Sequence, residues 1–207
     1  MTEPDICVVV PTIREWECIE DYVANARDHG FDTDRLEFVL VTEDFCPTDE
    51  MQTMLDDLDV EGSVFDESDR EDWYEAHGIE EFGHLVPAAS HAQTSFGLLY
   101  LWAHDHPYCL FIDDDTLPHD DVDFFGTHME NLQYEGELTE VASDEQWVNV
   151  LYENFDEHDL YPRGYPYSAM DEEREVGTTQ VEDVVASQGL WTNVPDLDAV
   201  RILMDGD

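Results

Sequence analysis

The stretch Ile6–Val10 (ICVVV) is a short, continuous apolar run that ends at Pro11. A run of this kind is typical of a strand that is buried on both faces of a parallel sheet. Apolar residues then recur at helical spacing over Trp16–His29, and Gly30 closes that segment. The beginning of the chain therefore predicts a buried strand followed by a helix, the first half of a strand–helix–strand unit.

The same alternation of strands and helices continues for most of the chain. Further strands are predicted at Glu37–Thr42, Ser63–Phe65 and Tyr108–Ile112. Helices are predicted over Met51–Leu58, after a capping box at Ser68–Glu71, and from about Ala88 to His104, with a loop at Gly78–Pro87. This order predicts an α/β fold with a mostly parallel sheet flanked by helices. We expect a single domain over residues 1–207, regular to about residue 135 and less regular from about 136 to 207.

The charge balance of the chain is extreme. Asp and Glu number 53 against 7 basic residues, all of them arginine, and the formal net charge is -46 over 207 residues. These acids are spread along the chain, and in molar salt, where the screening length falls to roughly 3 Å, such a surface keeps a protein dispersed. We therefore predict a salt-adapted protein that unfolds when KCl falls well below molar. Because phosphate contacts need Lys and Arg, the balance argues against nucleic acid and anionic membranes as partners.

Four cysteines, Cys7, Cys18, Cys46 and Cys109, lack the spacing of a zinc site or a disulfide framework. Cys7 and Cys109 lie inside apolar runs, which predicts small buried side chains. The N-terminal residues carry no basic stretch, and no apolar run approaches the length of a membrane span. We therefore expect a cytoplasmic protein without membrane insertion.

Polar residues follow the predicted strands at the edge where open parallel sheets bind ligands. They are Pro11–Arg14 after the first strand, Glu43–Asp44 after the second, and Asp113–Asp115 after the last. Alternate residues of an extended chain point to the same side, so Asp113 and Asp115 bring two carboxylates together, which suits Mn or Mg. An acidic triplet is also expected about three times by chance in so acidic a chain, and its place after a buried strand is what favours a metal site.

The few arginines divide into two groups. Arg27, Arg35 and Arg70 lie on or beside predicted helices, where we expect them to pair with nearby carboxylates. Arg14 and Arg163 lie in predicted loops with unusual sequences, Pro-Thr-Ile-Arg and Arg-Gly-Tyr-Pro. The sequence favours a functional role for Arg163, whereas Arg14 suits a binding residue and a structural partner of neighbouring glutamates equally well.

Four segments, in the same order along the chain, resemble the family of reversibly glycosylated polypeptides and UDP-arabinopyranose mutases. Val8–Arg14 (VVVPTIR) is similar to the opening strand and loop of that family. Ser95–Asp115, which begins with SFG and ends with FIDDD, is similar to its helix, strand and acidic triplet. Arg163–Ser168 (RGYPYS) and Gly189–Ala199 (GLWTNVPDLDA) resemble its Arg-Gly-Tyr-Pro and Gly-Leu-Trp segments. The resemblance covers nearly the whole chain and identifies it as a short, salt-adapted member.

The resemblance implies a GT-A-like, Rossmann-like fold that binds a UDP-sugar. Asp113 and Asp115 would then hold Mn or Mg on the diphosphate. Arg163 would be the arginine that family members glycosylate reversibly. The residues implied to bind the nucleotide sugar are Pro11, Thr12, Arg14, Asp44, Asp114, Gly189 and Trp191.

Departures from the family pattern bear on activity. His91–Ser95 lacks the family's basic residue, Gln188 stands where relatives have histidine, and an acidic insertion fills Met170–Glu182. The chain also lacks the long C-terminal part of its relatives, and either a homo-oligomer or a complex with a longer homologue would suit that length. The resemblance favours an enzyme that cleaves and re-forms the sugar–diphosphate bond as a mutase does. The alternatives are a glycosyltransferase for cell-surface glycans and a non-catalytic partner subunit or scaffold.

Overall fold

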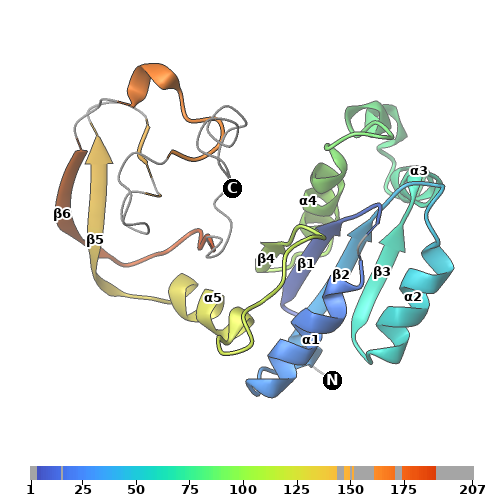
Figure 1. The fold of residues 1–207 in the computed structure, drawn as a ribbon. Coiled ribbons are helices and arrows are strands. Elements are labelled where there is room, and N and C mark those ends of the chain that lie inside the picture. The colour runs from blue at the N-terminus through green and yellow to red at the C-terminus, as the bar shows by residue number, and fades with distance from the viewer. Residues whose placement is uncertain are drawn as a thin grey trace, which may run out of the picture. The chain divides into compact units, whose positions relative to one another are not determined.

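The computed structural model describes residues 4–14, 16–143, 147–149, 151, 161–170 and 174–189. The chain forms two compact units, Met1–Thr127 and His128–Asp207 (Figure 1). The first unit holds a four-stranded sheet with its helices, and the second holds a two-stranded sheet. The division into two units does not test whether residues 1–207 form a single domain that is regular to about residue 135, and this stays a prediction.

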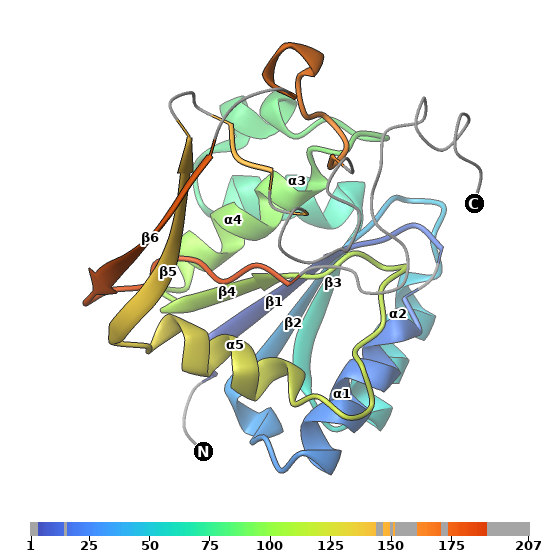
Figure 2. The same ribbon diagram turned by 60° about the vertical axis from the view of Figure 1, so that its left-hand side comes forward.

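The first unit is built on a sheet in which each strand is parallel to its neighbours. The strands, in the order β3-β2-β1-β4, are β1 (Ile6–Pro11), β2 (Leu36–Val41), β3 (Glu61–Phe65) and β4 (Tyr108–Phe111) (Figure 2). β1 lies between two strands, and Ile6–Val10 are all buried, which explains the unbroken apolar run. The prediction of an α/β fold with a Rossmann-like parallel sheet is confirmed.

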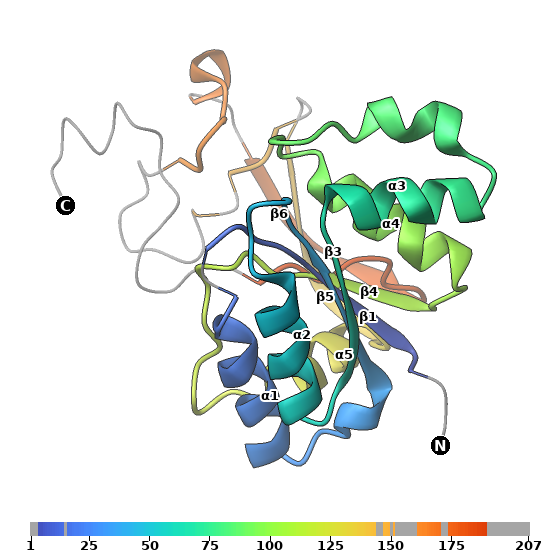
Figure 3. The same ribbon diagram turned by 90° about the vertical axis from the view of Figure 1, so that its right-hand side faces the viewer.

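Helices cover both faces of this sheet. α1 (Cys18–Asp28) and α2 (Thr48–Asp57) lie on one face, whereas α3 (Glu67–Ala76) and α4 (Gln93–Ala103) lie on the other (Figure 3). The chain runs outward from β1 to β3 and then returns to add β4 on the opposite side of β1, which is why the helices change face. The carboxyl ends of β1 and β4 therefore form a topological switch point, where sheets of this type bind ligands.

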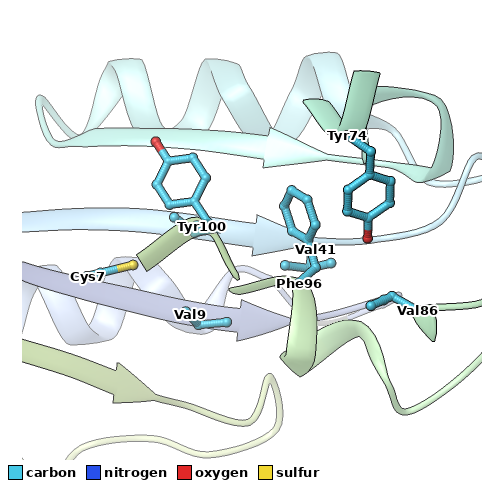
Figure 4. Packing of buried hydrophobic residues seen from close by; sticks show 8 residues of the cluster. Cys7, Val9, Val41, Tyr74, Val86, Phe96 and Tyr100 are labelled. Carbon is cyan, nitrogen blue, oxygen red and sulfur yellow. The ribbon is translucent and has the colours of Figure 1, made fainter. Parts of the chain in front are cut away.

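One core cluster lies between the sheet and the helices α3 and α4 (Figure 4). Alternate residues of β1 and β2 pack there against aromatic side chains: Cys7, Val9, Val39, Val41, Tyr74, Val86, Phe96 and Tyr100. Gly97 allows α4 to approach β1, since a Cβ at this position would lie 2.3 Å from Cγ1 of Val9. Close packing thus explains the glycine of the Phe-Gly pair.

α3 differs from the prediction in two ways. Asp66, and not Ser68, caps the helix: its side chain accepts from the amide of Asp69, and the Asp69 side chain accepts from the amide of Asp66. Arg70 was expected to pair with a carboxylate, and this is wrong. The residue is 2% exposed, and Nη1 donates to the backbone carbonyl of Thr42 at 2.5 Å. The prediction failed because helical position alone does not tell which face packs on the sheet.

The segment before α4 also departs from the prediction. The helix begins at Gln93, well after the predicted start at Ala88. Ala89 has a left-handed φ of 51°, a conformation that cannot continue a right-handed helix. The predicted loop contains a 3-10 helix, η2 (Glu80–Leu85). The chain therefore needs a longer connection between α3 and α4 than the apolar pattern indicated.

Cys7 and Cys109 are opposite each other on β1 and β4. Cys7 is fully buried, as predicted, and Cys109 is only partly buried because β4 lies at the edge of the described sheet. A hydrogen bond between the two thiols raises the pKa of Cys7 and lowers that of Cys109. All four cysteines are free, in agreement with the predicted absence of a disulfide framework.

The second unit contains an antiparallel pair of strands. β5 (Gly136–Ser143) pairs with β6 (Arg174–Val181) along its whole length. A 3-10 helix, η3 (Tyr167–Ala169), precedes β6, and α5 (Phe124–Leu132) spans the boundary between the units in sequence. The sequence did not predict these strands, because β5 is largely exposed and has no clean apolar alternation. No helix in the described part of the chain is long and apolar enough to cross a membrane.

Candidate functional site

Thr12 and Asp114 join the carboxyl ends of β1 and β4. Thr12 directly follows β1 and is 2% exposed, and its hydroxyl donates to Oδ2 of Asp114 at 2.7 Å. The amide of Thr12 donates to the carbonyl of Val41 in β2 at 3.0 Å, so the sheet fixes its backbone. Two predicted site residues that are 102 positions apart in sequence therefore meet at the topological switch point.

The acidic triplet lies in a turn that α1 anchors. The carbonyl of Asp113 accepts from the amide of Thr116 at 3.2 Å and from its hydroxyl at 2.8 Å. The Thr116 hydroxyl also shares a hydrogen bond of 2.9 Å with the hydroxyl of Tyr22, a buried residue of α1. Burial raises the pKa of Tyr22 to about 12, so this hydroxyl stays protonated at neutral pH. The backbone of the triplet is thus tied to the core of the first unit.

Asn25, on the next turn of α1, holds the rest of this loop. Nδ2 donates to the carbonyls of His119 and Val122, each at 2.9 Å, and Oδ1 accepts from the amide of Phe124 at 3.1 Å. Because Asn25 is only 6% exposed, these bonds satisfy an amide group that would otherwise be buried without partners. Sequence reasoning missed Asn25 and Tyr22, although both are polar residues three positions apart on the apolar face of a predicted helix.

The carboxylates of Asp113 and Asp115 are exposed on this anchored turn. Among the described residues, no hydrogen bond or ion pair engages either side chain, whereas Asp114 between them is bound to Thr12. Hard carboxylate oxygens suit Mn or Mg. The described part of the chain contains no cluster of three or more His, Cys, Asp or Glu that could ligate a metal by itself. Two carboxylates still suit Mg, which commonly binds one or two of them together with substrate phosphates.

The acids after β2 serve the fold. Glu43 is 5% exposed, and its Oε1 accepts from the amide of Ala89 and from the side chain of Gln93 at the start of α4. Asp44 is exposed, and its Oδ1 accepts from the amide of Glu67 at 2.9 Å in the first turn of α3. A carboxylate is stabilising at a helix N-terminus. Asp44 therefore has a structural partner, and its predicted contact with a nucleoside stays a prediction.

Pro11 and Arg14 flank Thr12 in the sequence. Pro11 is the last residue of β1 and pairs in register with Val41. The amide of Arg14 donates to the Thr12 hydroxyl at 3.4 Å, and its side chain is exposed. Among the described residues Arg14 forms no ion pair, with Glu17 or any other acid. Glu15, the other neighbouring glutamate, lies outside the described residues, so the binding role of Arg14 stays a prediction.

Arg163 lies in a tight turn of the second unit and is exposed. Gly164 has a φ of 86°, a left-handed conformation that favours glycine, and the amide of Tyr165 donates to the carbonyl of Pro162 at 3.0 Å. The ring of Tyr165 packs against that of Tyr161, with 5.1 Å between the centroids. The turn thus explains the glycine of the Arg-Gly-Tyr-Pro segment, and the catalytic role of Arg163 stays a prediction.

Gly189 is exposed near α5 in the second unit. A Cβ at this position would lie 3.7 Å from Nε2 of His128, an ordinary contact, so packing does not require glycine here. His128 itself shares a hydrogen bond of 3.0 Å with Ser187, and burial lowers the pKa of its imidazole. Trp191, the other predicted residue of the Gly-Leu-Trp segment, lies outside the described residues.

The architecture is that of a Rossmann-like α/β protein with a polar loop at its switch point. A family model described as reversibly glycosylated polypeptide matches residues 70–206, and the chain belongs to this family. It is also similar to a probable UDP-arabinopyranose mutase 4 of Arabidopsis thaliana, with 33% identity over 97 residues. That alignment covers 44% of this chain and 22% of the plant protein. The predicted family is confirmed, and three of the four similar segments lie within the matched residues, whereas Val8–Arg14 precedes them.

Proposed function

We propose that this chain binds a UDP-sugar together with Mn or Mg at the carboxyl ends of β1 and β4. We propose further that it is an enzyme that breaks and re-forms the bond between the sugar and the diphosphate. The observation that carries the proposal is the Thr12–Asp114 hydrogen bond, which fixes an acidic turn at the switch point of the sheet. Membership of the family and the likeness to a probable UDP-arabinopyranose mutase support a nucleotide sugar as the ligand.

Asp113 and Asp115 are the proposed metal ligands. Their exposed carboxylates have no hydrogen-bond partner among the described residues, while Thr116 and Tyr22 hold the backbone of the turn. A bound divalent ion would stabilise the charge that develops on the diphosphate as it leaves the sugar. Thr12 would keep the turn in place against β1 when the charged ligand binds.

The proposed reaction separates the anomeric carbon from a diphosphate oxygen, and the electron pair stays with UDP. In a mutase the same two groups recombine after the sugar ring has changed its form, whereas in a glycosyltransferase an acceptor hydroxyl takes the sugar. The exposed guanidinium of Arg14 would place a positive charge near the phosphates.

Arg163 is the proposed site of sugar attachment, and the support is the likeness of its segment to that of the family. Pro11, Asp44, Gly189 and Trp191 are proposed contacts of the nucleotide sugar on the same ground.

Calorimetric titration of UDP in molar KCl, with and without Mn, tests the proposed site. We expect binding that requires Mn and weakens at least about tenfold in Asp113→Asn and in Asp115→Asn. Asp121→Asn is the matched control, because Asp121 is an exposed acid of the same loop and its loss removes the same charge. Unchanged affinity in both ligand variants would contradict the metal site, and equal losses in all three variants would indicate a general charge effect.

A non-catalytic partner subunit is the second candidate function. Gln188 in place of the family's histidine and the absence of a basic residue from His91–Ser95 favour it. Incubation of UDP-sugars with the chain alone, and then with a longer homologue added, separates the two functions. Turnover by the chain alone excludes the partner role. Mn-dependent UDP binding with turnover only in the mixture supports it.

A further inference from the structure

Two cysteines that the proposed function does not use face each other across neighbouring strands. Cys7 on β1 pairs in register with Cys109 on β4, and both side chains lie on the face of the sheet that α4 covers. Cys7 belongs to the core cluster on that face, as Figure 4 shows, and Cys109 packs against this cluster. Neighbouring strands lie about 4.8 Å apart, within the range of about 4.4 to 6.8 Å that separates the Cα atoms of a disulfide. The backbone therefore allows these two thiols to be joined.

The two thiols differ in their access to solvent. Cys7 is 0% exposed, because β1 is buried on both faces. Cys109 is partly exposed, because β4 lies at the edge of the described sheet. A small reagent in solution therefore reaches Cys109, whereas Cys7 can react only with a group that Cys109 already carries. This is the arrangement of a reacting cysteine and a resolving cysteine.

The surroundings of the pair assign its proton to Cys7. On the other side of β1, Cys7 is opposite Glu37 of β2, and the hydroxyl of Tyr100 holds this carboxylate in place. The hydrogen bond with Cys109, burial and the negative charge of Glu37 raise the pKa of Cys7. The hydrogen bond that Cys7 donates lowers the pKa of Cys109. Because the thiolate is the reactive form of cysteine, Cys109 is the more reactive sulfur of the two.

We propose that Cys7 and Cys109 are a site of reversible oxidation, where a small hydroperoxide converts the two thiols into a disulfide. The Cys109 thiolate attacks the peroxide, the O–O bond breaks, and the leaving oxygen takes a proton from solvent, so that Cys109 carries a sulfenic acid. The Cys7 sulfur then attacks the Cys109 sulfur, and the hydroxyl leaves as water with the proton of Cys7. The two thiols thus supply the two electrons that reduce the peroxide.

The disulfide would fasten the edge strand β4 to the interior of the sheet. β1 leads into Thr12 and β4 leads into the acidic loop, so the bond joins the two strands that carry the proposed nucleotide-sugar site. A bond between residues so far apart in the sequence restricts the unfolded chain and should stabilise the first unit. Neither cysteine is a proposed contact of the nucleotide sugar, so oxidation and UDP binding can be tested independently.

Treatment of the full chain with hydrogen peroxide in molar KCl, followed by alkylation of the remaining thiols and peptide mapping without reduction, tests the proposal. We expect a peptide in which Cys7 is linked to Cys109, and dithiothreitol should restore both thiols. Cys46→Ser is the matched control, because Cys46 is also partly exposed but its thiol donates to the carbonyl of Ile13 at 3.7 Å. This variant should give the same linked peptide as the wild type.

Cys7→Ser tests whether Cys7 resolves the oxidised form of Cys109. Without Cys7 the sulfenic acid on Cys109 has no partner, so dimedone should label Cys109 at least about tenfold more in this variant than in the wild type. Equal labelling of Cys109 in the two proteins overturns the proposal. Wild-type protein in which Cys7 and Cys109 both remain thiols while Cys46 is oxidised overturns it as well, and this result does not depend on the folding of a variant.

Discussion

Two acidic regions at opposite edges of the parallel sheet differ in how the fold uses them: Asp5 and Glu37 where the strands begin, and the loop after β4 where they end. At the edge where the strands begin, the fold engages them. Glu37 lies at the start of β2, and its Oε1 accepts from the hydroxyl of Tyr100 at 2.5 Å. The other oxygen of this carboxylate, Oε2, lies 2.7 Å from Nε2 of His106. This is ion-pair distance, although the two groups are not aligned for a hydrogen bond. Asp5, just before β1, forms a two-point hydrogen bond with Arg35.

At the edge where the strands end, the fold engages Glu43 and Asp44 after β2. The loop after β4 differs, because its backbone is fixed while two of its carboxylates have no partner among the described residues. Thr12, Tyr22 and Asn25 hold the acidic loop through its backbone and through Asp114, and they leave Asp113 and Asp115 exposed. In a chain with 53 acids, the presence of a carboxylate does not by itself mark a functional site. A carboxylate that has no partner but stands on an anchored backbone is a better indication of such a site, because the fold fixes its position without using it for stability.

The largest expected effect on stability comes from removing the Glu37 side chain at the edge where the strands begin. Glu37→Ala removes the partner of two buried polar side chains and should lower the free energy of unfolding by about 3–5 kcal/mol. Denaturant unfolding in molar KCl measures it, with Glu61→Ala, an exposed strand residue of β3, as the control. A loss below about 1 kcal/mol would mean that the Glu37 cluster does not stabilise the fold.

Next in size is the loss of the loop anchor at the second edge. Asn25→Ala removes three hydrogen bonds and leaves backbone groups of the loop unpaired, so we expect a loss of about 2–3 kcal/mol. If the proposed site is right, Mn-dependent UDP binding should weaken as well, because the acidic turn is no longer held. Glu20→Ala, an exposed change on the same helix, should alter neither quantity. A stable Asn25→Ala protein would contradict the anchoring role.

A smaller, pH-dependent effect is expected from Asp5. The hydrogen bond from Arg35 holds the pKa of Asp5 below its usual value, so the folded chain binds fewer protons at this group than the unfolded chain. Its contribution is complete above the ordinary pKa of about 4 and is lost as the pH falls through the lower folded value. The Asp5 side chain is 36% exposed, so solvent screening keeps the effect small.

Unfolding of wild type and Asp5→Asn in molar KCl at several pH values measures this effect. The stability difference between the two proteins should shrink as the pH is lowered. A difference that stays constant down to roughly pH 2 would contradict the role of the Asp5 carboxylate.

The smallest effect on stability should come from a substitution of an exposed acid in the loop after β4. Asp113→Asn changes an exposed side chain without partners, so the free energy of unfolding should stay within about 0.5 kcal/mol of the wild type. Denaturant unfolding beside the UDP titration measures both quantities on one sample. A loss above about 1 kcal/mol would mean that Asp113 serves the fold as Glu37 does, and the contrast between the edges would fail.

The two central strands of the first unit, β1 and β2, were predicted closely because they are buried on both faces. The bounds of β1, β2 and β4 in the structure differ from the predicted ones by at most one residue at each end. β3 begins two residues before its predicted start. The exposed pair of β5 and β6 was not predicted, since neither face of β5 is continuously buried. Helix starts were less predictable, because Asp66 and Ala89 set them through a cap and a left-handed residue.

The sequence by itself determined the α/β class, the succession of strands and helices along the chain, and the family, whereas the order β3-β2-β1-β4 within the sheet came from the structure. These follow from local periodicity and from motifs that are contiguous in the chain. Only the tertiary structure decided which polar residues serve the fold. It assigned Arg70 to backbone carbonyls, Glu43 to the start of α4 and Asn25 to the acidic loop. Such roles depend on partners far away in the sequence, as with Thr12 and Asp114, and packing brings those partners together where no local pattern records them.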